Sequence, residues 1–254
     1  MGVCRVPRPS TSTPPGRPWP YVRYRTSNNE EERMAGRGLA RLGGVCGLLY
    51  VLLLVPAYVV GYPDAPTPTS GAREVIGYFG ASPDTFVLAN GVLAVFSTFF
   101  FVWFLAALHG LLGRVEGAEG GLSSAALAGG TLFIVLSCAG YAAEVVYPAA
   151  MLRFENFTPG AEPAFTALAL SAWLYHFCQV GASVMVTATS LVALGTGVLP
   201  RWLALVGFVV ALLTLLHFLL PLPGALAGLL WVALVSALML IASERAYAPR
   251  RLAR

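Results

Sequence analysis

Lysine is absent from this chain, and charged residues of every kind are scarce. Charged residues make up 11% of the 254 residues, whereas a soluble domain carries about 25%. Hydrophobic residues make up 57%, and the mean hydropathy is +0.73. A soluble protein covers its surface with polar side chains, and this chain has too few of them to do so. The composition therefore excludes an ordinary soluble domain and favours an integral membrane protein.

Sequence motifs for common enzyme chemistry are also absent. The chain has no P-loop, no dinucleotide-binding fingerprint, no GxSxG motif and no HExxH or HxxxH spacing. Its four cysteines form no CxxC pair, and three of them fall in apolar stretches, which argues against a disulfide framework and a zinc site. We therefore predict no catalytic residue, no metal site and no cofactor, and the sequence does not favour an enzyme.

The sixteen basic residues are all arginine and gather near the two ends of the chain. The pI of about 9.0 alone would suit a nucleic-acid-binding protein. However, no such motif is present, and arginines that flank apolar spans are typical of membrane anchors. We therefore expect the lipid bilayer, and not nucleic acid, as their partner, with a second copy or another membrane protein as a further partner. Arginine in place of lysine, with abundant Ala, Gly and Pro, suggests a GC-rich bacterial genome.

The N-terminal segment 1–37 is rich in Pro, Ser and Arg. Four prolines between residues 13 and 20 oppose a regular helix, and the segment has no apolar core of a signal peptide. We predict that 1–37 is a disordered tail. An alternative is that translation starts at Met34. The consecutive glutamates just before it can be encoded by GAG codons, which resemble a bacterial ribosome-binding sequence.

Six apolar spans follow, and each reaches or approaches the roughly 20 residues that cross a bilayer. They are continuous and not alternating, which indicates helices, since the backbone has no water partners in lipid. We predict an all-α polytopic bundle of six transmembrane helices over residues 38–243, with a basic tail at 244–254. The spans cover about residues 39–61, 85–112, 124–147, 165–194, 202–219 and 224–242.

The placement of arginine predicts the orientation. Arginines concentrate before the first span and after the last, so both termini are expected in the cytoplasm of a bacterium, with the chain in its inner (cytoplasmic) membrane. Arg114 and Arg201 place the loops after the second and fourth spans on the same side. The flanking arginines are Arg33, Arg37, Arg41, Arg245, Arg250, Arg251 and Arg254.

The first outer loop contains a candidate amphipathic helix. Ser70 can cap a short helix that places Val75, Ile76 and Phe79 on one face. Such a face is suited to lie on the membrane surface, and the alternative is an ordinary loop.

The turn "GVLPRWL", residues 197–203, has a plain topological meaning: Gly and Pro separate two helices, and Arg and Trp mark an interface. With the stretch "AREVIGYFGASPDTFVLANGVLAVFSTFFFVWFLAAL" upstream, it resembles a family of uncharacterised bacterial, mainly actinobacterial, multi-pass membrane proteins classed as a domain of unknown function. The resemblance spans about residues 38–243. It implies the fold and brings no substrate or catalytic residue.

The fourth span carries a polar stripe. At about 100° per residue, its members His176, Gln179, Ser183, Thr187 and Ser190 share an arc of about 80°. One interpretation is that these groups hold helices together. The other is that they line a polar crevice.

Glu144 in the third span is an intramembrane carboxylate, which is a functional-site hypothesis by default. It lies near the outer end of its span, so it can alternatively reach the interface. Tyr141 is suited to bridge Glu144 and His176, and convergence with His217 would suit a divalent metal or a proton relay. The candidate intramembrane site is Tyr141, Glu144, His176, Gln179 and His217.

Small residues at GxxxG spacing, Gly43 with Gly47 and Gly224 with Gly228, favour close helix packing. Together with the lack of a catalytic motif, they favour a non-enzymatic structural or interaction protein. The alternative is a small-solute or proton-coupled carrier that uses the polar stripe and Glu144. A membrane enzyme is the third hypothesis.

Overall fold

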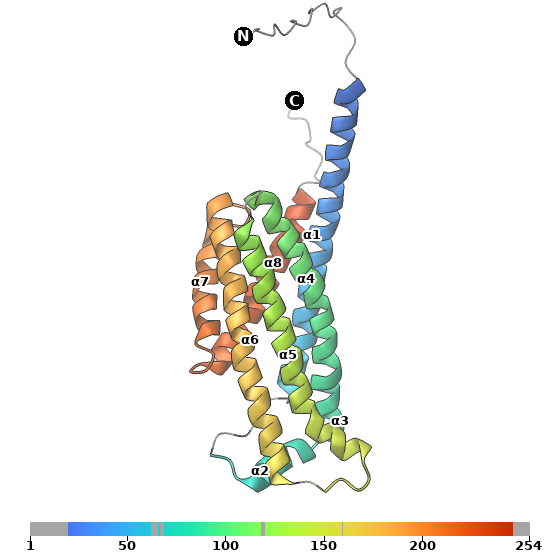
Figure 1. The fold of residues 1–254 in the computed structure, drawn as a ribbon, viewed down its shortest axis with the longest axis vertical. Coiled ribbons are helices and arrows are strands. Elements are labelled where there is room, and N and C mark those ends of the chain that lie inside the picture. The colour runs from blue at the N-terminus through green and yellow to red at the C-terminus, as the bar shows by residue number, and fades with distance from the viewer. Residues whose placement is uncertain (1–19, 62–65, 67–68, 118–119, 159, 246–254) are drawn as a thin grey trace, which may run out of the picture. The chain divides into compact units, whose positions relative to one another are not determined.

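A computed structural model describes residues 20–61, 66, 69–117, 120–158 and 160–245. Every element among these residues is a helix, which confirms the all-α prediction (Figure 1). In chain order the elements are α1 (Pro20–Gly61), α2 (Ala72–Gly80), α3 (Pro83–Phe86), the π-helix η1 (Val87–Leu93), α4 (Ala94–Glu116), α5 (Gly121–Arg153), α6 (Ala161–Thr196), α7 (Arg201–Leu215) and α8 (Pro221–Arg245).

The chain divides into two compact units, Met1–Ala35 and Gly36–Arg254. The described part of the first unit, residues 20–35, is helical, whereas the sequence predicts a disordered tail up to residue 37. Pro20 occupies the first position of α1, where its fixed φ and missing N–H are tolerated. Residues 1–19 and 246–254 lie outside the described residues, and a start at Met34 stays a prediction.

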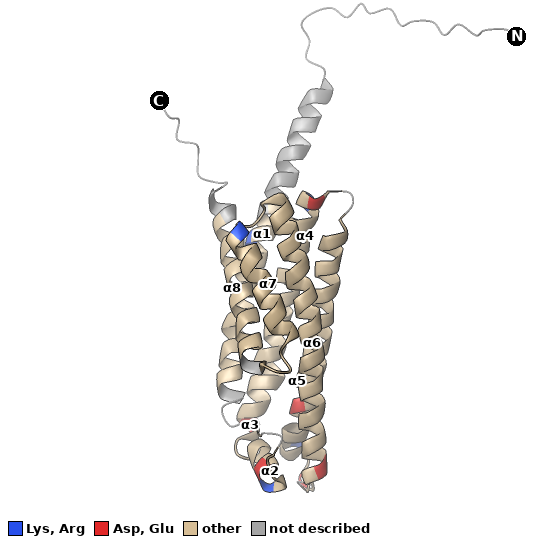
Figure 2. Cartoon of the chain, turned by 90° about the vertical axis from the view of Figure 1, so that its left-hand side faces the viewer, with Lys and Arg blue, Asp and Glu red and all other residues tan. Residues whose placement is uncertain are grey.

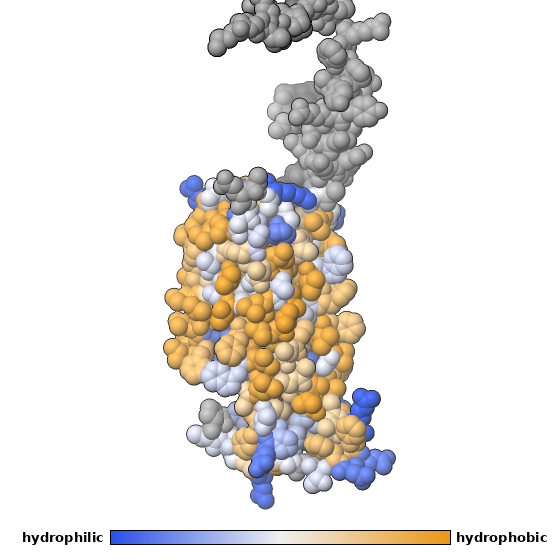
Figure 3. Space-filling view, in the orientation of Figure 1, coloured by the Kyte–Doolittle hydropathy of each residue, from blue (hydrophilic) through white to orange (hydrophobic). Residues whose placement is uncertain are grey.

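Five helices are long and apolar enough to cross a membrane, in agreement with a multi-pass membrane protein. They are Gly38–Val59, Pro83–Glu116, Gly121–Arg153, Ala161–Thr196 and Pro223–Ile241. The predicted span at 202–219 corresponds to α7, an apolar helix of only 15 residues, or about 23 Å at 1.5 Å per residue. The face of the second unit seen in Figure 3 is largely apolar between its ends, while charged residues gather toward the two ends (Figure 2).

Glycines bring the helices of the second unit into close contact. A Cβ on Gly129 of α5 would lie 2.7 Å from the carbonyl oxygen of Gly181 on α6, and a Cβ on Gly181 would lie 2.6 Å from that of Gly129. A Cβ on Gly43 would overlap Ala107, and one on Gly47 would overlap Ser236. The predicted close packing at Gly43 and Gly47 is therefore confirmed, and it joins α1 to α4 and α8.

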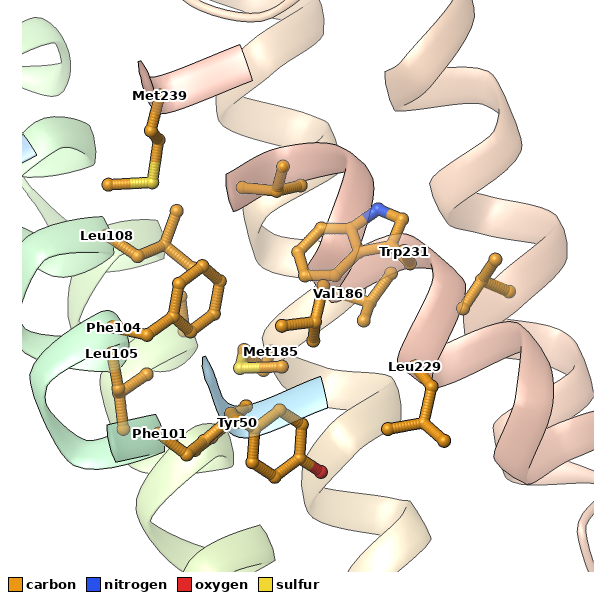
Figure 4. Packing of buried hydrophobic residues seen from close by; sticks show 14 of the residues in the cluster. Tyr50, Phe101, Phe104, Leu105, Leu108, Met185, Val186, Leu229, Trp231 and Met239 are labelled. Carbon is orange, nitrogen blue, oxygen red and sulfur yellow. The ribbon is translucent and has the colours of Figure 1, made fainter. Parts of the chain in front are cut away.

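The core of the bundle consists of large apolar side chains from α1, α4, α6 and α8 (Figure 4). Tyr50 of α1 packs on Phe101 of α4 with ring centroids 4.7 Å apart, and Phe101 packs on Phe133 of α5 at 5.2 Å. Trp231 of α8 is 1% exposed. Helices α5 and α7 also contribute side chains, so α1 and α4 to α8 all meet in this one core.

A separate cluster, here called the aromatic lobe, joins α2 and α3 to the ends of α5 and α6. Its buried members are Val75, Phe79, Phe86, Tyr147, Ala164 and Ala167. The predicted short helix is confirmed as α2, but Gly71 and not Ser70 is its N-cap. The predicted membrane-surface position of its apolar face is wrong, because Val75 and Phe79 are fully buried against the protein itself.

The side chain of Glu116 stabilises the connection between α4 and α5 by accepting two backbone hydrogen bonds from the start of α5. Its Oε1 accepts the N–H of Leu122, and its Oε2 accepts the N–H of Ser123, both at 2.7 Å. These are free N–H groups in the first turn of α5, where a carboxylate also meets the positive end of the helix dipole. Gly117 adopts a φ of 81°, which lets the chain turn. The connection that follows Arg114, which lies in the last turn of α4, is therefore held by local hydrogen bonds.

Candidate functional site

In the C-terminal half of α6, the polar stripe faces α7. Ser183 Oγ donates to the backbone carbonyl oxygen of Ala211 on α7 at 2.9 Å. Ser190 Oγ lies where a Cβ on Gly207 of α7 would stand, so the two helices touch there. For Ser183 and Ser190 the structure thus supports the interpretation that the stripe holds helices together.

His176, at the other end of the stripe, lies beside His217 in the turn after α7. The two ring centroids are 5.3 Å apart, and the rings of Trp173 and Phe218 lie 5.7 Å and 5.3 Å from His176. Trp173 and Phe218 are more than half exposed. The histidine pair is therefore part of an aromatic patch on the outer surface of α6 and α7.

The histidine pair does not join Glu144 in a metal site. Over the described ranges of the chain, no three His, Cys, Asp or Glu side chains are grouped to hold a metal ion. The convergence of Glu144, His176 and His217 that would suit a divalent metal is therefore not found among these residues. The physical reason is the direction of the side chains around the axis of α6. His176 points toward His217 in the turn after α7, whereas the neighbouring Tyr175 points toward Glu144.

Glu144 lies inside the bundle between α5 and α6, with only 1% of its surface exposed. The Oη of Tyr175 donates a hydrogen bond to Glu144 Oε2 at 2.8 Å. Tyr141 packs its ring edge-to-face on Tyr175, with centroids 5.5 Å apart. A Cβ on Gly140 would lie 2.8 Å from the Tyr175 ring, so this glycine leaves room for it. Tyr141 is thus near Glu144, as predicted, but the phenol that donates to the carboxylate belongs to Tyr175.

Asn90 lies in η1, which packs on α5, the helix that carries Glu144. These helices are antiparallel, and a Cβ on Gly91 would meet Val145 Cγ1 at 3.4 Å. Asn90 directly precedes Gly91 in the sequence, and Glu144 directly precedes Val145. Going back by one residue along each of two antiparallel helices rotates the two side-chain directions toward the same side of the helix pair. Both are 1% exposed, so this side is the protein interior.

Two further phenols complete the group. The hydroxyls of Tyr58 on α1 and Tyr141 on α5 lie within electrostatic range of the Glu144 carboxylate. We call the set Tyr58, Asn90, Tyr141, Glu144 and Tyr175 the Glu144 layer. It combines one carboxylate, one amide and three phenols from η1 and three transmembrane helices.

A small cavity adjoins this layer. It measures about 30 Å³, and its lining includes Tyr50, Tyr58 and Gln179. A buried water needs about 10–15 Å³ of such space, so the cavity has room for about two waters. Gln179, one helical turn from Tyr175, is 8% exposed and lies on the cavity. Tyr58 belongs to both the cavity and the Glu144 layer, which joins them.

Glu144, Tyr141 and Gln179 were identified from the sequence, and Asn90 of the second span was identified there as a polar group able to join them, but Tyr175 was missed. Tyr175 precedes His176, and on a helical wheel the two point about 100° apart, so choosing the histidine face left the tyrosine out.

No family model, curated protein or solved structure matches the chain. The resemblance to the bacterial family classed as a domain of unknown function thus stays a prediction, and the roles of the Glu144 layer rest on its own chemistry.

Proposed function

We propose that this protein is a carrier of small solutes in the bacterial cytoplasmic membrane, and that Glu144 loads and releases the coupling proton or cation. The observation that carries the proposal is the burial of Glu144, at 1% exposure, in a helix long and apolar enough to span a membrane. Burying a carboxylate in such a place is costly, and residues of this kind mark ion and proton pathways in membrane proteins.

The surroundings of Glu144 support a site that changes its charge state. A phenol bonds directly to the carboxylate through Tyr175. A phenol can donate to the ionised carboxylate and can accept from the protonated one. The neighbouring cavity has space for water beside Tyr58 and Gln179. Glu144 therefore has partners in either state and a short polar path next to it.

The small-residue faces that favoured an interaction protein are used inside the bundle. Gly43 and Gly47 pack on α4 and α8. A Cβ on Gly224 would lie 2.8 Å from the carbonyl oxygen of Leu213 on α7. These glycine-rich helix faces pack against other helices of the same chain, so they give no support to contacts with a partner protein. This shifts the balance from a structural or interaction protein toward the carrier.

Six spans with both termini in the cytoplasm complete the proposal. α7 returns from α6 to the start of α8 and runs beside both (Figure 1). The turn after α7 adds Leu216, Phe218 and Leu219, all exposed and apolar. This turn lengthens the apolar surface of the short helix, so that α7 with its turn makes the sixth crossing.

The test is ion flux in inverted membrane vesicles that hold an imposed pH gradient, followed by a pH-sensitive dye. We expect that at least one of a panel of Na⁺, Li⁺, K⁺, choline and amino acids dissipates the gradient with the wild-type protein. The Glu144→Gln variant removes the charge at nearly constant volume and should abolish this effect. The control Glu162→Gln, at the exposed start of α6, should behave as wild type. Equal responses of wild type and Glu144→Gln to every solute would refute the carrier.

A further inference from the structure

We infer that the Glu144 layer is a binding site for a monovalent alkali cation of the size of sodium. The inference rests on the proposed function and names its coupling ion. It is carried by three features: the oxygen-rich set of side chains, the buried amide of Asn90, and the single carboxylate among the layer's five residues.

The donor set is the kind that hard cations prefer. Glu144 offers carboxylate oxygens, Tyr175 a phenol oxygen and Asn90 an amide oxygen, and such ligands suit alkali and alkaline-earth ions. The soft ligand nearby is Cys178, whose Sγ donates to the backbone carbonyl oxygen of Tyr175 at 3.1 Å. Carboxylate, phenol and amide oxygens do not select Zn²⁺ or Cu⁺, which favour thiolate and imidazole.

Asn90 gives the independent observation. It is 1% exposed, and its Nδ2 has no hydrogen-bond partner. An unpaired buried donor is costly and asks for an explanation. The oxygen and nitrogen of an amide have nearly the same shape, so rotation about the Cβ–Cγ bond exchanges their positions. With a cation in the layer, the rotated amide presents Oδ1 to it, and the unpaired donor is replaced by a ligand.

The backbone at Asn90 supports the same conclusion. Asn90 lies in the middle of the seven-residue π-helix Val87–Leu93, and the regular helix α4 starts directly after it. π-Helical turns are rare and occur frequently at functional sites. Asn90 is 1% exposed, so the side chain points from this π-helix into the protein interior.

Charge and space select a small monovalent ion. The layer contains one carboxylate, so a monovalent cation makes it neutral, whereas a divalent cation leaves a net positive charge in an apolar span. Space is limited because the Tyr175 ring rests on Gly140, where even a Cβ would approach it to 2.8 Å. The adjoining cavity measures about 30 Å³. Na⁺ is the smaller of the two common alkali cations and is therefore the ion we assign.

The experiment measures thermal unfolding of the purified full-length protein in detergent, by tryptophan fluorescence. NaCl, KCl and choline chloride are compared at equal ionic strength. We expect a saturable rise of Tm with Na⁺ that is smaller with K⁺ and absent with choline. Asn90→Ala should weaken the apparent Na⁺ affinity about tenfold or more, since a bond to a charged group is lost. Glu144→Gln should abolish the rise.

Matched controls and a second variant keep the outcomes distinct. Asn156→Ala and Glu155→Gln change exposed residues of one loop and should keep the wild-type response. If Glu144→Gln does not fold, Tyr175→Phe removes one oxygen at nearly the same volume and should weaken Na⁺ binding. Identical Tm values in the three salts, or an Asn90→Ala variant whose apparent Na⁺ affinity equals that of the wild type, overturn the inference. A larger effect of K⁺ overturns the assignment of sodium.

Failure of this inference differs from failure of the carrier. Flux that depends on Glu144 without any effect of Na⁺ on Tm leaves a carrier coupled to protons. Loss of both the flux and the Na⁺ effect removes both proposals.

Discussion

Replacing Gly181 by alanine is expected to lower the free energy of unfolding by about 1–3 kcal/mol, the usual cost of overpacking. The new Cβ would stand 2.6 Å from the carbonyl oxygen of Gly129 and 2.7 Å from the backbone nitrogen of Phe133. Backbone atoms cannot rotate away as a side chain can, so α5 and α6 must separate. Unfolding in mixed micelles with increasing SDS, followed by tryptophan fluorescence, measures the change.

Gly195→Ala is the matched control on the same helix. A Cβ there meets nothing within 4 Å. Alanine is the better helix former by about 1 kcal/mol, so this variant should be as stable as wild type or slightly more stable. Equal stabilities of Gly181→Ala and Gly195→Ala would contradict a close α5–α6 crossing.

Replacing Phe79 by alanine is expected to destabilise the aromatic lobe by about 3–5 kcal/mol, the typical cost of removing a buried phenylalanine. Phe79 is fully buried, and its ring lies 5.5 Å from that of Phe86 and 5.3 Å from that of Tyr147. Its loss should open the lobe locally and leave the spans folded, because the lobe has its own apolar cluster. Hydrogen exchange read by mass spectrometry over residues 72–93 should rise strongly.

The same change should expose Glu144. Tyr147 belongs to the lobe and stands three residues after Glu144 on α5, which places both on one face of the helix. Opening the lobe should therefore increase hydrogen exchange over residues 141–151 as well. Glu74→Ala, on the exposed side of α2, should leave both regions unchanged. Unaltered exchange in Phe79→Ala would contradict the packing of α2 on α5 and α6.

The helices could be predicted from the sequence because continuous apolar runs have no other stable form in lipid. Their ends could not. The third and fourth spans were expected at 124–147 and 165–194, but the helices run over Gly121–Arg153 and Ala161–Thr196. Apolarity marks only the part of a helix that crosses lipid, and α5 and α6 continue beyond it into the aromatic lobe.

The candidate site was predicted in part for a related reason. Glu144 stands out because a carboxylate in an apolar span is rare. Its partners depend on how each helix is rotated against its neighbours, which a single sequence does not contain. The α6 stripe is a true face of the helix, but Ser183 uses it to bind α7, while the residue that reaches Glu144 is Tyr175.

Labelling with a hydrophobic carbodiimide tests most directly that Glu144 is a carboxyl group that binds a proton or cation inside the bundle. This reagent modifies protonated carboxyl groups in apolar surroundings. Mass spectrometry of the wild-type protein should find the adduct on Glu144, and its yield should fall as the pH rises or Na⁺ is added. Labelling confined to exposed carboxyl groups such as Glu155 and Glu162, or labelling of Glu144 that neither pH nor cations change, would contradict the account.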